Sequence, residues 1–305
     1  MRLVFAGTPD AAVPSLRRLA SSDHDLAAIV TRRDAPIGRK RVLTPSPVAI
    51  VGVELGIPTI KTDRLDAAAT SAIVDLAPDL GVIVAYGGLV REPLLSVPRL
   101  GWINLHFSLL PRWRGAAPVQ RALIAGDRVT GASVFQLVPE LDAGDIFETE
   151  RLTVPDGATA GDVLTALSES GARLLLGVVD ALAAGTARAH PQQGEPTLAP
   201  KLTIDDGALD WHEPAERVLA RFAGVTPEPG AHTTVGGARL KIIAARPAVG
   251  DALAPGELAS AGGAVLIGTG TTPIELVTVQ PAGKALMRAA DWFRGLRLDA
   301  PVAGA

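Results

Sequence analysis

Three side chains that could do chemistry stand on alternate residues near the middle of the sequence. Asn104, His106 and Ser108 lie in WINLHFSLLPRWRGAAP, which begins like a buried strand and breaks into a loop marked by proline, arginine and glycine. Alternate residues of a strand point to one face, so these three groups share a face. An imidazole gives or takes protons, and an amide donates hydrogen bonds without titrating. The pattern favours acid–base chemistry here, against the alternative of a structural histidine.

A carboxylate partner for the imidazole follows the next apolar segment. Asp142 and Asp145 stand in PELDAGDIF, directly after that segment. If the two strands are neighbours, Asp142 can reach His106, fix its tautomer and raise its pKa above about 6.5. The alternative is that both aspartates only shape a turn.

Other catalytic chemistries fit the sequence poorly. A hydrolase triad of Ser108, His106 and Asp142 lacks the G-x-S-x-G elbow, and a serine and a histidine two residues apart on a strand point in parallel. The chain has no cysteine, which excludes disulfides, thiolate–zinc sites and thiol nucleophiles. No H-E-x-x-H motif is present, and we expect no metal. The remaining histidines are scattered, at His24, His190, His212 and His232.

Positive charge is local rather than global. The formal net charge is only −3, so the chain as a whole has no field that would attract nucleic acid. Arg32–Arg41 holds five basic residues and one acidic residue, while Pro111–Arg128 and Lys284–Arg297 each hold four and one. Such stretches can grip a polyanion, and the alternative is a solvated face.

Apolar runs separated by amphipathic stretches predict the elements that position these residues. The runs expected to form strands are Arg2–Gly7, Asp25–Thr31, Leu80–Tyr86, Trp102–His106 and Gly131–Val138. The expected helices are Ala12–Ser21, Pro47–Gly56, Asp66–Leu76 and Asp162–Ala184. This alternation is typical of a parallel α/β sheet with both faces covered. Ligands of such sheets bind at the carboxyl ends of the strands, which is where His106 falls.

The first expected strand ends in FAGTPD, which is similar to a phosphate-binding glycine turn. It has neither G-x-G-x-x-G nor G-x-x-x-x-G-K-[ST], so nucleotide binding is weakly supported and a dinucleotide-dependent dehydrogenase is disfavoured. We expect a tight turn from strand to helix, in which Thr8 or Asp10 caps the helix.

Length and composition predict two domains. At 305 residues the chain exceeds the usual size of one domain. Residues 185–204, rich in proline, glycine and glutamine, are expected to link residues 1–184 to residues 205–305. Short strands split by glycine and proline predict a small all-β barrel or sandwich in the last part. No apolar run reaches about 18 residues and no leader precedes the first strand, so we expect a cytoplasmic protein without a membrane partner.

These segments together are similar to those of the methionyl-tRNA formyltransferases, over essentially the full length. The segments that carry the resemblance are FAGTPD, GR followed by PSPV (Gly38–Arg39, Pro45–Val48), IVAYG (Ile83–Gly87), INLHFSLLPRWRGAAPVQRALIAGD, TGASVFQLVPELDAGDI and VQPAGKALM (Val279–Met287). The combination is far more specific than any one of these motifs.

The resemblance implies a Rossmann-like formyltransferase domain followed by an OB-like barrel that binds tRNA. A formyl group would pass from 10-formyltetrahydrofolate, a co-substrate rather than a permanently bound cofactor, to the α-amine of methionine on initiator tRNA. The family's catalytic positions fall on Asn104, His106 and Asp142. Its folate-binding positions fall on Ser108, Leu109, Leu110, Pro111, Tyr86, Gly87, Gly88 and Leu89. The family implies a monomer whose tRNA-binding positions fall on Arg39, Lys40, Arg41 and Lys201.

The chain departs from the common pattern of that family at Phe107, where many members have glycine. We expect this side chain to point away from Asn104 and His106. Formyltransferases that act on a sugar nucleotide or on glycinamide ribonucleotide share the same catalytic pattern and are the nearest alternative. A folate-binding or RNA-binding protein without catalysis is the other, and the intact Asn104, His106 and Asp142 weigh against it.

Overall fold

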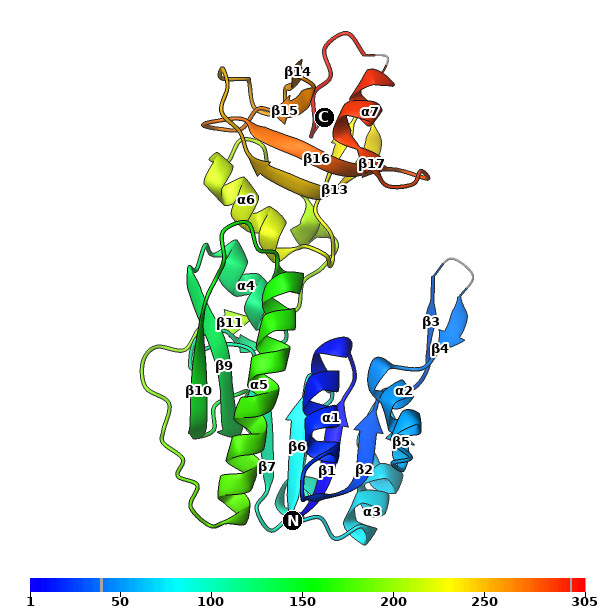
Figure 1. Cartoon of the computed structure of the whole chain (residues 1–305), viewed down its shortest axis with the longest axis vertical. Helices are drawn as coiled ribbons and strands as arrows, with labels where there is room; N and C mark the ends of the chain where they lie inside the picture. Colours follow the sequence, from blue (N-terminus) through cyan, green and yellow to red (C-terminus); the bar gives the residue numbers. More distant parts are fainter. Residues whose placement is uncertain (39–40, 297, 305) are drawn as a thin grey trace. The chain divides into compact units, whose positions relative to one another are not determined.

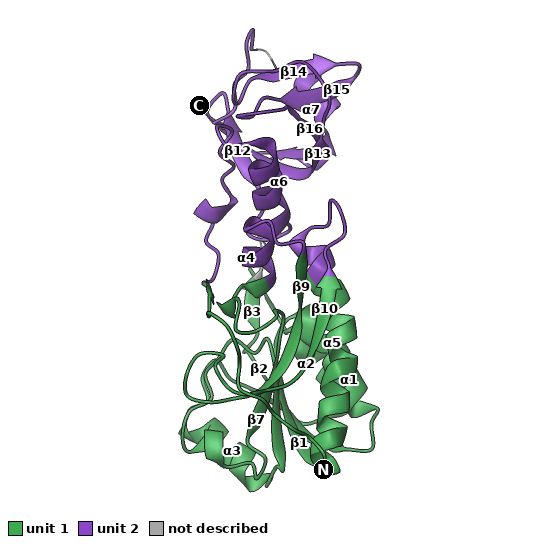
Figure 2. Ribbon diagram, turned by 90° about the vertical axis from the view of Figure 1, so that its left-hand side faces the viewer, with its two compact units in different colours: residues 1–118, 129–152, 164–199 green, residues 119–128, 153–163, 200–305 purple. Residues whose placement is uncertain are grey.

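The computed structural model describes residues 1–38, 41–296 and 298–304, and these fall into two compact units. Unit 1, green in Figure 2, consists of Met1–Pro118, Val129–Leu152 and Leu164–Ala199. Unit 2, purple in the same figure, consists of Val119–Arg128, Thr153–Val163 and Pro200–Ala305. The functional domain boundaries expected at residues 184 and 204 stay predictions.

Unit 1 is built on a seven-stranded sheet with the spatial order β10-β9-β7-β6-β1-β2-β5 (Figure 1). Its strands are β1 (Arg2–Gly7), β2 (Asp25–Thr31), β5 (Thr59–Lys61), β6 (Leu80–Val84), β7 (Trp102–His106), β9 (Val129–Gln136) and β10 (Ile146–Thr153). All five strands expected from the sequence are present, with the first, second and fourth at the expected bounds. β5 is short and β10 contains mostly polar and charged residues after its first two, so neither has the continuous apolar run that marked the others.

The sheet has the Rossmann-like arrangement that was expected, with one strand reversed. β1 pairs in parallel with β2 and β6, and β6 pairs in parallel with β7. β9 runs antiparallel to β7, so the expectation of a wholly parallel sheet is wrong at this strand. The only α-helix described between β7 and β9 is α4 (Pro118–Ile124), whose seven residues rise about 10 Å. Because β9 is antiparallel to β7, the chain re-enters the sheet from the end where β7 stops.

Helices cover both faces of the sheet, and capping side chains explain where two of them begin. The helices of unit 1 are α1 (Val13–Ala20), α2 (Pro47–Glu54), α3 (Ala67–Asp75) and most of α5 (Ala160–Ala183). The Ser46 hydroxyl accepts from the amide of Ala49, and the Asp66 carboxylate accepts from the amide of Ala69. In Figures 1 and 2, α1 and α5 lie on one face and α3 on the other. No helix among the described residues is long and apolar enough to cross a membrane.

The glutamine- and proline-rich segment after α5 is folded along unit 1 at least as far as residue 199. His190 forms an isolated β-bridge with Ile146. Further on, β11 (Leu198–Ala199) pairs in parallel with β8 (Arg114–Gly115). Composition predicted a linker here, and the structure shows a segment with specific backbone partners beside the loop that follows β7.

Unit 2 contains the antiparallel sheet expected of the small all-β part, with order β12-β13-β16-β15-β14 and β17 paired to β16. Its strands and helices are β12 (His232–Val235), β13 (Ala238–Pro247), β14 (Leu258–Ala261), β15 (Ala264–Ile267), β16 (Ile274–Pro281), β17 (Met287–Arg288), α6 (Ala215–Gly224) and α7 (Ala289–Arg294). Ala303 bridges Val235 at one edge, and Val302 bridges Glu257 beside the other edge. These two adjacent residues therefore join the edges and close the sheet into a small barrel.

Two glycines of unit 1 give a matched test of this packing. In Gly81→Ala the new Cβ would lie 2.1 Å from the fully buried ring of Trp102, so we expect a loss of about 1–3 kcal/mol in the free energy of unfolding. In Gly177→Ala, within α5, no atom lies within 4 Å of the new Cβ, and we expect a gain of about 0.5–1 kcal/mol. Urea unfolding measures both, and equal midpoints for the two variants would contradict the packing described.

Candidate active site

The carboxyl ends of the three central strands lie in a row. The register sets Gly7 of β1 beside Val84 of β6, and Val84 beside Leu105 of β7. The loops that follow β1 and β6 meet there, where the Thr8 hydroxyl donates to the carbonyl of Tyr86 at 3.1 Å. This is the edge at which open α/β sheets bind ligands.

The FAGTPD turn is explained by packing at this edge. A Cβ on Gly7 would lie 2.9 Å from the Cβ of Ala12 and 3.0 Å from the carbonyl oxygen of Val84. The expected capping role of Thr8 or Asp10 is wrong, because neither helical segment after β1 has a side-chain cap. Thr8 joins the loop after β6 instead.

The His106 imidazole is buried at the end of β7, with 6% of the residue exposed. Its Nε2 donates to the carbonyl oxygen of Trp113 at 2.8 Å. A carbonyl only accepts, so this bond places the proton of the neutral ring on Nε2 and leaves the lone pair on Nδ1. The ring of Phe135, on β9, meets the imidazole edge to face with centroids 6.4 Å apart.

Asp142 faces the other ring nitrogen. Its Oδ2 lies 3.7 Å from Nδ1 of His106 and accepts the backbone N–H of Gly115 at 2.8 Å. The structure thus brings together two residues 36 positions apart, as the neighbouring strands predicted. The expectation that Asp142 fixes the tautomer is wrong, because the Trp113 carbonyl holds the proton at Nε2.

Burial lowers the pKa of His106 below its ordinary value of 6.5. The negative charge of Asp142 and the bond to Trp113 act in the opposite direction and are smaller effects. The predicted rise in pKa is therefore wrong, since loss of water around the charged ring outweighs the carboxylate. The neutral form of the ring is therefore favoured over the charged form more strongly than in a free imidazole, and Nδ1 is turned to a carboxylate.

The Asn104 amide lies two residues before His106, on the same face of β7. Its Oδ1 is buried and has no hydrogen-bond partner among the residues that the structure describes. A buried polar atom left unpaired costs about 1–3 kcal/mol, so it marks a position where a ligand atom would be stabilised. A half-turn of the amide exchanges oxygen for nitrogen there, so the same position can present a donor.

Residues Ser108–Pro111 are built into the loop itself. The buried Ser108 hydroxyl donates to the carbonyl of Arg112 at 2.6 Å, and the Ser108 carbonyl accepts from the Ser133 hydroxyl at 2.7 Å. The backbone N–H of Leu110 donates to the Ser133 hydroxyl at 3.3 Å. Leu110 and Pro111 are buried and Leu109 is half-buried. The Phe107 side chain is buried as well, with 6% exposed.

The loop Tyr86–Leu89 contains one core side chain and one exposed side chain. Tyr86 packs in the core with Ile73 and Trp102, its hydroxyl donates to the carbonyl of Thr62 at 3.1 Å, and burial raises its pKa. The guanidinium of Arg32 donates to the carbonyl of Gly87. The backbone of Gly87 and Gly88 and the 66%-exposed side chain of Leu89 are what this loop offers to a ligand.

Of the four expected tRNA contacts the structure describes two, one in each unit. Arg39 and Lys40 lie outside the described residues. Arg41 is exposed and directly precedes β4 (Val42–Thr44), which pairs with β3 (Ala35–Ile37). Lys201 is exposed in unit 2.

The segment that carries Lys201 is held at several points within unit 2. The carbonyl of Pro200 accepts from Nε of Arg121, and the same guanidinium pairs with Asp206 at 3.1 Å. Hydrogen bonds from Thr203 lower the pKa of Asp206, more strongly than Arg121 does. Lys201 thus projects from an ordered segment.

Sequence reasoning missed the backbone groups that complete the site. The Trp113 carbonyl and the Gly115 N–H hold the imidazole and the carboxylate, and no residue type announces a backbone role. It also missed Gln192, whose Nε2 donates to the carbonyls of Asp142 at 2.8 Å and Gly144 at 2.9 Å. Gln192 stands in a stretch that composition marks as a linker.

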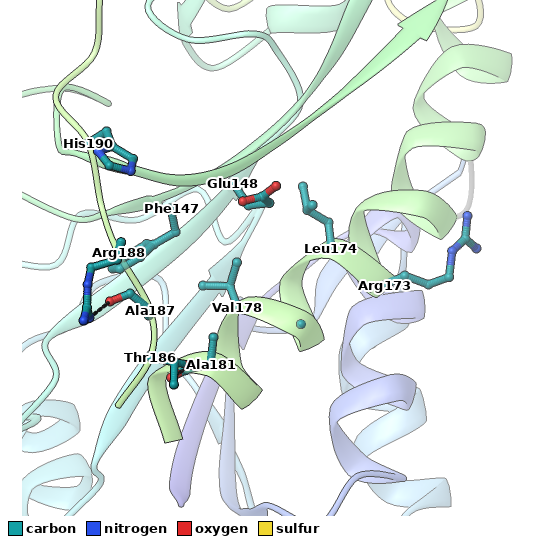
Figure 3. Close-up of a pocket in the computed structure, with 11 residues that line it drawn as sticks. Phe147, Glu148, Arg173, Leu174, Val178, Ala181, Thr186, Ala187, Arg188 and His190 are labelled. Carbon is teal, nitrogen blue, oxygen red and sulfur yellow. Dashed lines mark hydrogen bonds between the residues drawn. The ribbon is translucent and has the colours of Figure 1, made fainter. Parts of the chain in front are cut away.

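A cleft of about 460 Å³ elsewhere in unit 1 is distinct from this group of residues (Figure 3). Its apolar lining includes Phe147, Leu174 and Val178, and its charged lining includes Glu148 and Arg173. None of the site residues expected from the sequence lines it. Among the described residues there is also no group of three His, Asp or Glu side chains that could hold a metal ion.

Comparisons with known proteins match the whole chain to one family. The family model described as formyl transferase matches residues 1–179, and that described as formyl transferase, C-terminal domain, matches residues 201–297. The chain is 64% identical over 298 residues to a methionyl-tRNA formyltransferase of Clavibacter sepedonicus, covering 97% of each chain.

Two solved structures show a similar fold at low sequence identity. One is HypX from Aquifex aeolicus in complex with tetrahydrofolic acid, with a TM-score of 0.66 and 18% identity over 99% of this chain and 50% of that one. The other is a methionyl-tRNA formyltransferase from Clostridium thermocellum, with a TM-score of 0.58 and 14% identity over 82% of this chain and 95% of that one.

The buried imidazole gives a titration that can be measured. We expect the His106 ring to titrate below pH 6.5 in the folded protein, and still lower in Asp142→Asn, because the carboxylate raises its pKa. At a pH between the pKa of His106 in the folded protein and its pKa in the unfolded chain, the unfolded chain binds a proton that the folded protein does not bind. The contribution of His106 to the stability of the folded protein is therefore lost as the pH falls from about 6.5. NMR of the imidazole resonances measures the midpoints, with Asp145→Asn as the control for charge. A midpoint that rises in Asp142→Asn would contradict the assignment.

Proposed function

The chain belongs to the methionyl-tRNA formyltransferase family, and from this premise we propose how its residues divide the work of the reaction. The reaction transfers a formyl group from 10-formyltetrahydrofolate to the α-amine of methionine on initiator tRNA, in support of translation initiation. The amine nitrogen attacks the formyl carbon, a tetrahedral oxyanion forms, the amine loses a proton, and the bond to the folate nitrogen breaks. The enzyme must therefore stabilise an oxyanion and move one proton.

The first task falls to Asn104. The observation that carries the proposal is the buried amide oxygen of Asn104, which has no hydrogen-bond partner among the described residues, on the face of β7 that also holds the imidazole. An amide donor aimed at the oxyanion is worth about 2.7–4 kcal/mol in acyl-transfer enzymes. Asn104 supplies such a donor at every working pH, because an amide does not titrate.

The second task falls to Asp142 and His106 together. An α-amine has a pKa near 8, so roughly a tenth of it is already neutral at pH 7 and a modest base suffices. Nδ1 of the neutral imidazole and Oδ2 of Asp142 both have lone pairs and lie 3.7 Å apart. A proton taken from the amine by Asp142 can be shared with Nδ1 and then returned to the folate nitrogen as it leaves.

The remaining residues bind the two substrates. Folate would lie against the loops Ser108–Pro111 and Tyr86–Leu89, mainly through their backbone and the side chain of Leu89. It is a co-substrate that departs after each turnover, and no other cofactor is needed. Initiator tRNA would be held by Arg39, Lys40, Arg41 and Lys201, in a monomer that works in the cytoplasm. Residues 1–184 would be the catalytic domain and residues 205–305 the tRNA-binding domain, joined by residues 185–204.

Removing the Asn104 amide tests the oxyanion role. Asn104→Ala should lower kcat by about 100- to 1000-fold, the effect of one oxyanion donor, while tRNA affinity stays near native. Asn104→Asp, which keeps the shape and replaces the donor by a negative charge, should lose at least as much. Steady-state kinetics with charged initiator tRNA and a filter-binding Kd give the two readouts. Equal losses in kcat and in tRNA affinity would assign Asn104 to binding instead.

Removing one basic side chain tests the tRNA contacts. Arg39→Ala should raise the KM for tRNA and reduce the slope of log K against log salt by about one, the value for one phosphate contact. Arg151→Ala, an exposed arginine of β10 outside the basic stretch, is the matched control. If both variants behave alike, the effect is one of net charge and the contact is refuted.

A further inference from the structure

The segment His190–Ala199, called the strap below, runs beside the site and is tied to it at both ends. At its start, His190 exchanges two backbone hydrogen bonds with Ile146, at 2.8 and 2.9 Å. Figure 3 shows the start of the strap and the residues just before it, where Thr186, Ala187, Arg188 and His190 line the cleft described above. At its end, Thr197 accepts from the N–H of Trp113 through its hydroxyl and from the N–H of Arg114 through its carbonyl.

The middle of the strap carries Gln192, and both halves of its amide are used. Its Nε2 donates to the carbonyl oxygens of Asp142 and Gly144, at 2.8 and 2.9 Å. Its Oε1 accepts from Nε and one Nη of Arg114, at 3.1 and 2.6 Å. A guanidinium only donates and a carbonyl only accepts, so the partners fix which way the amide points. Only an amide side chain can both donate to the two carbonyls and accept from the guanidinium, and the side chain of asparagine is one methylene shorter than that of glutamine.

Both backbone segments that Gln192 and Thr197 hold are in an unfavourable conformation. Asp142 has φ +46° and Trp113 has φ +62°, in the left-handed region that side chains larger than glycine rarely adopt. These are the residues whose carboxylate and carbonyl face the two nitrogens of His106. Such conformations persist only where the surroundings hold them, and they concentrate at functional sites.

We infer that Gln192 is a positioning residue, which holds Asp142 against His106 by joining the Asp142 loop to Arg114. The inference rests on the proposed role of Asp142 in moving the proton. The strap is then part of the machinery of formyl transfer through its contacts with the Asp142 loop and with Trp113. Loss of the amide lets the carboxylate drift from Nδ1 while the binding surfaces for folate and tRNA stay in place.

The first experiment compares two neighbouring glutamines in the full-length enzyme. Gln192→Met keeps the length and volume of the side chain and removes its hydrogen bonds. We expect kcat to fall of the order of 10- to 100-fold, the scale of a displacement of about 1 Å, with KM for both substrates near native. Gln193→Met is the matched control, because Gln193 is exposed and adjacent. Equal kcat in the two variants would overturn the inference.

A second variant separates the two halves of the amide. Gln192→Glu keeps an acceptor for Arg114 and places an oxygen against the carbonyls of Asp142 and Gly144. If the amide acts by holding the Asp142 loop, Gln192→Glu loses activity as Gln192→Met does. Retention of native kcat in Gln192→Glu would show that only the Arg114 contact matters, and would refute the positioning of Asp142.

A double-mutant cycle with Asp142→Asn shows whether Gln192 acts through the carboxylate. We expect Gln192→Met to have no further effect on kcat once Asp142→Asn is present, whereas a purely structural defect would multiply the two losses. Native turnover in Asp142→Asn alone would refute the role of the carboxylate and the inference with it. Impaired turnover in Asp142→Asn, with Gln192→Met equal to Gln193→Met, would refute the inference alone.

Discussion

Burial of the His106 imidazole is the constraint on which the site depends. A ring without water needs an acceptor for its N–H, and the charged form of the ring is penalised. The Trp113 carbonyl accepts a hydrogen bond from Nε2, and the Asp142 carboxylate faces Nδ1. Each partner reaches the ring only because a loop turns back over the end of β7, and each loop includes a residue with a left-handed backbone. The conformations of these two loops are thus tied to the burial of the ring.

Most of the polar side chains around the ring form hydrogen bonds to backbone groups of the loops. Ser108 and Ser133 bond to backbone groups of the segment after β7, and Thr197 bonds to the N–H of Trp113. Asn104 differs from them, since its buried Oδ1 has no hydrogen-bond partner among the described residues. It is also the single asparagine in the sequence, placed in a strand where asparagine is disfavoured. A polar side chain that does not serve the fold is best explained by the substrate.

The sequence allowed a good prediction of the elements and a partial prediction of the site. Buried strands such as Trp102–His106 are continuous apolar runs, so their bounds could be read directly. β9 has the same kind of run, but its antiparallel direction cannot be read from its own residues. The pKa of His106 was predicted with the wrong sign, because residue types reveal the carboxylate but not how dry the ring is. Gln192 could not be found, since its role depends on partners distant in the chain.

The closure of the barrel in unit 2 has a consequence for the order in which the chain is made. Residues 302 and 303 join the edges of a sheet whose other strands all precede residue 289. Until they have been synthesised, β14 and the end of β12 at Val235 present unpaired backbone groups, which are templates for strands of other molecules. In the newly made chain, residues 302 and 303 therefore compete with strands of other molecules for the edges of this sheet. Rapid pairing of residues 302 and 303 with these edges protects the chain from aggregation.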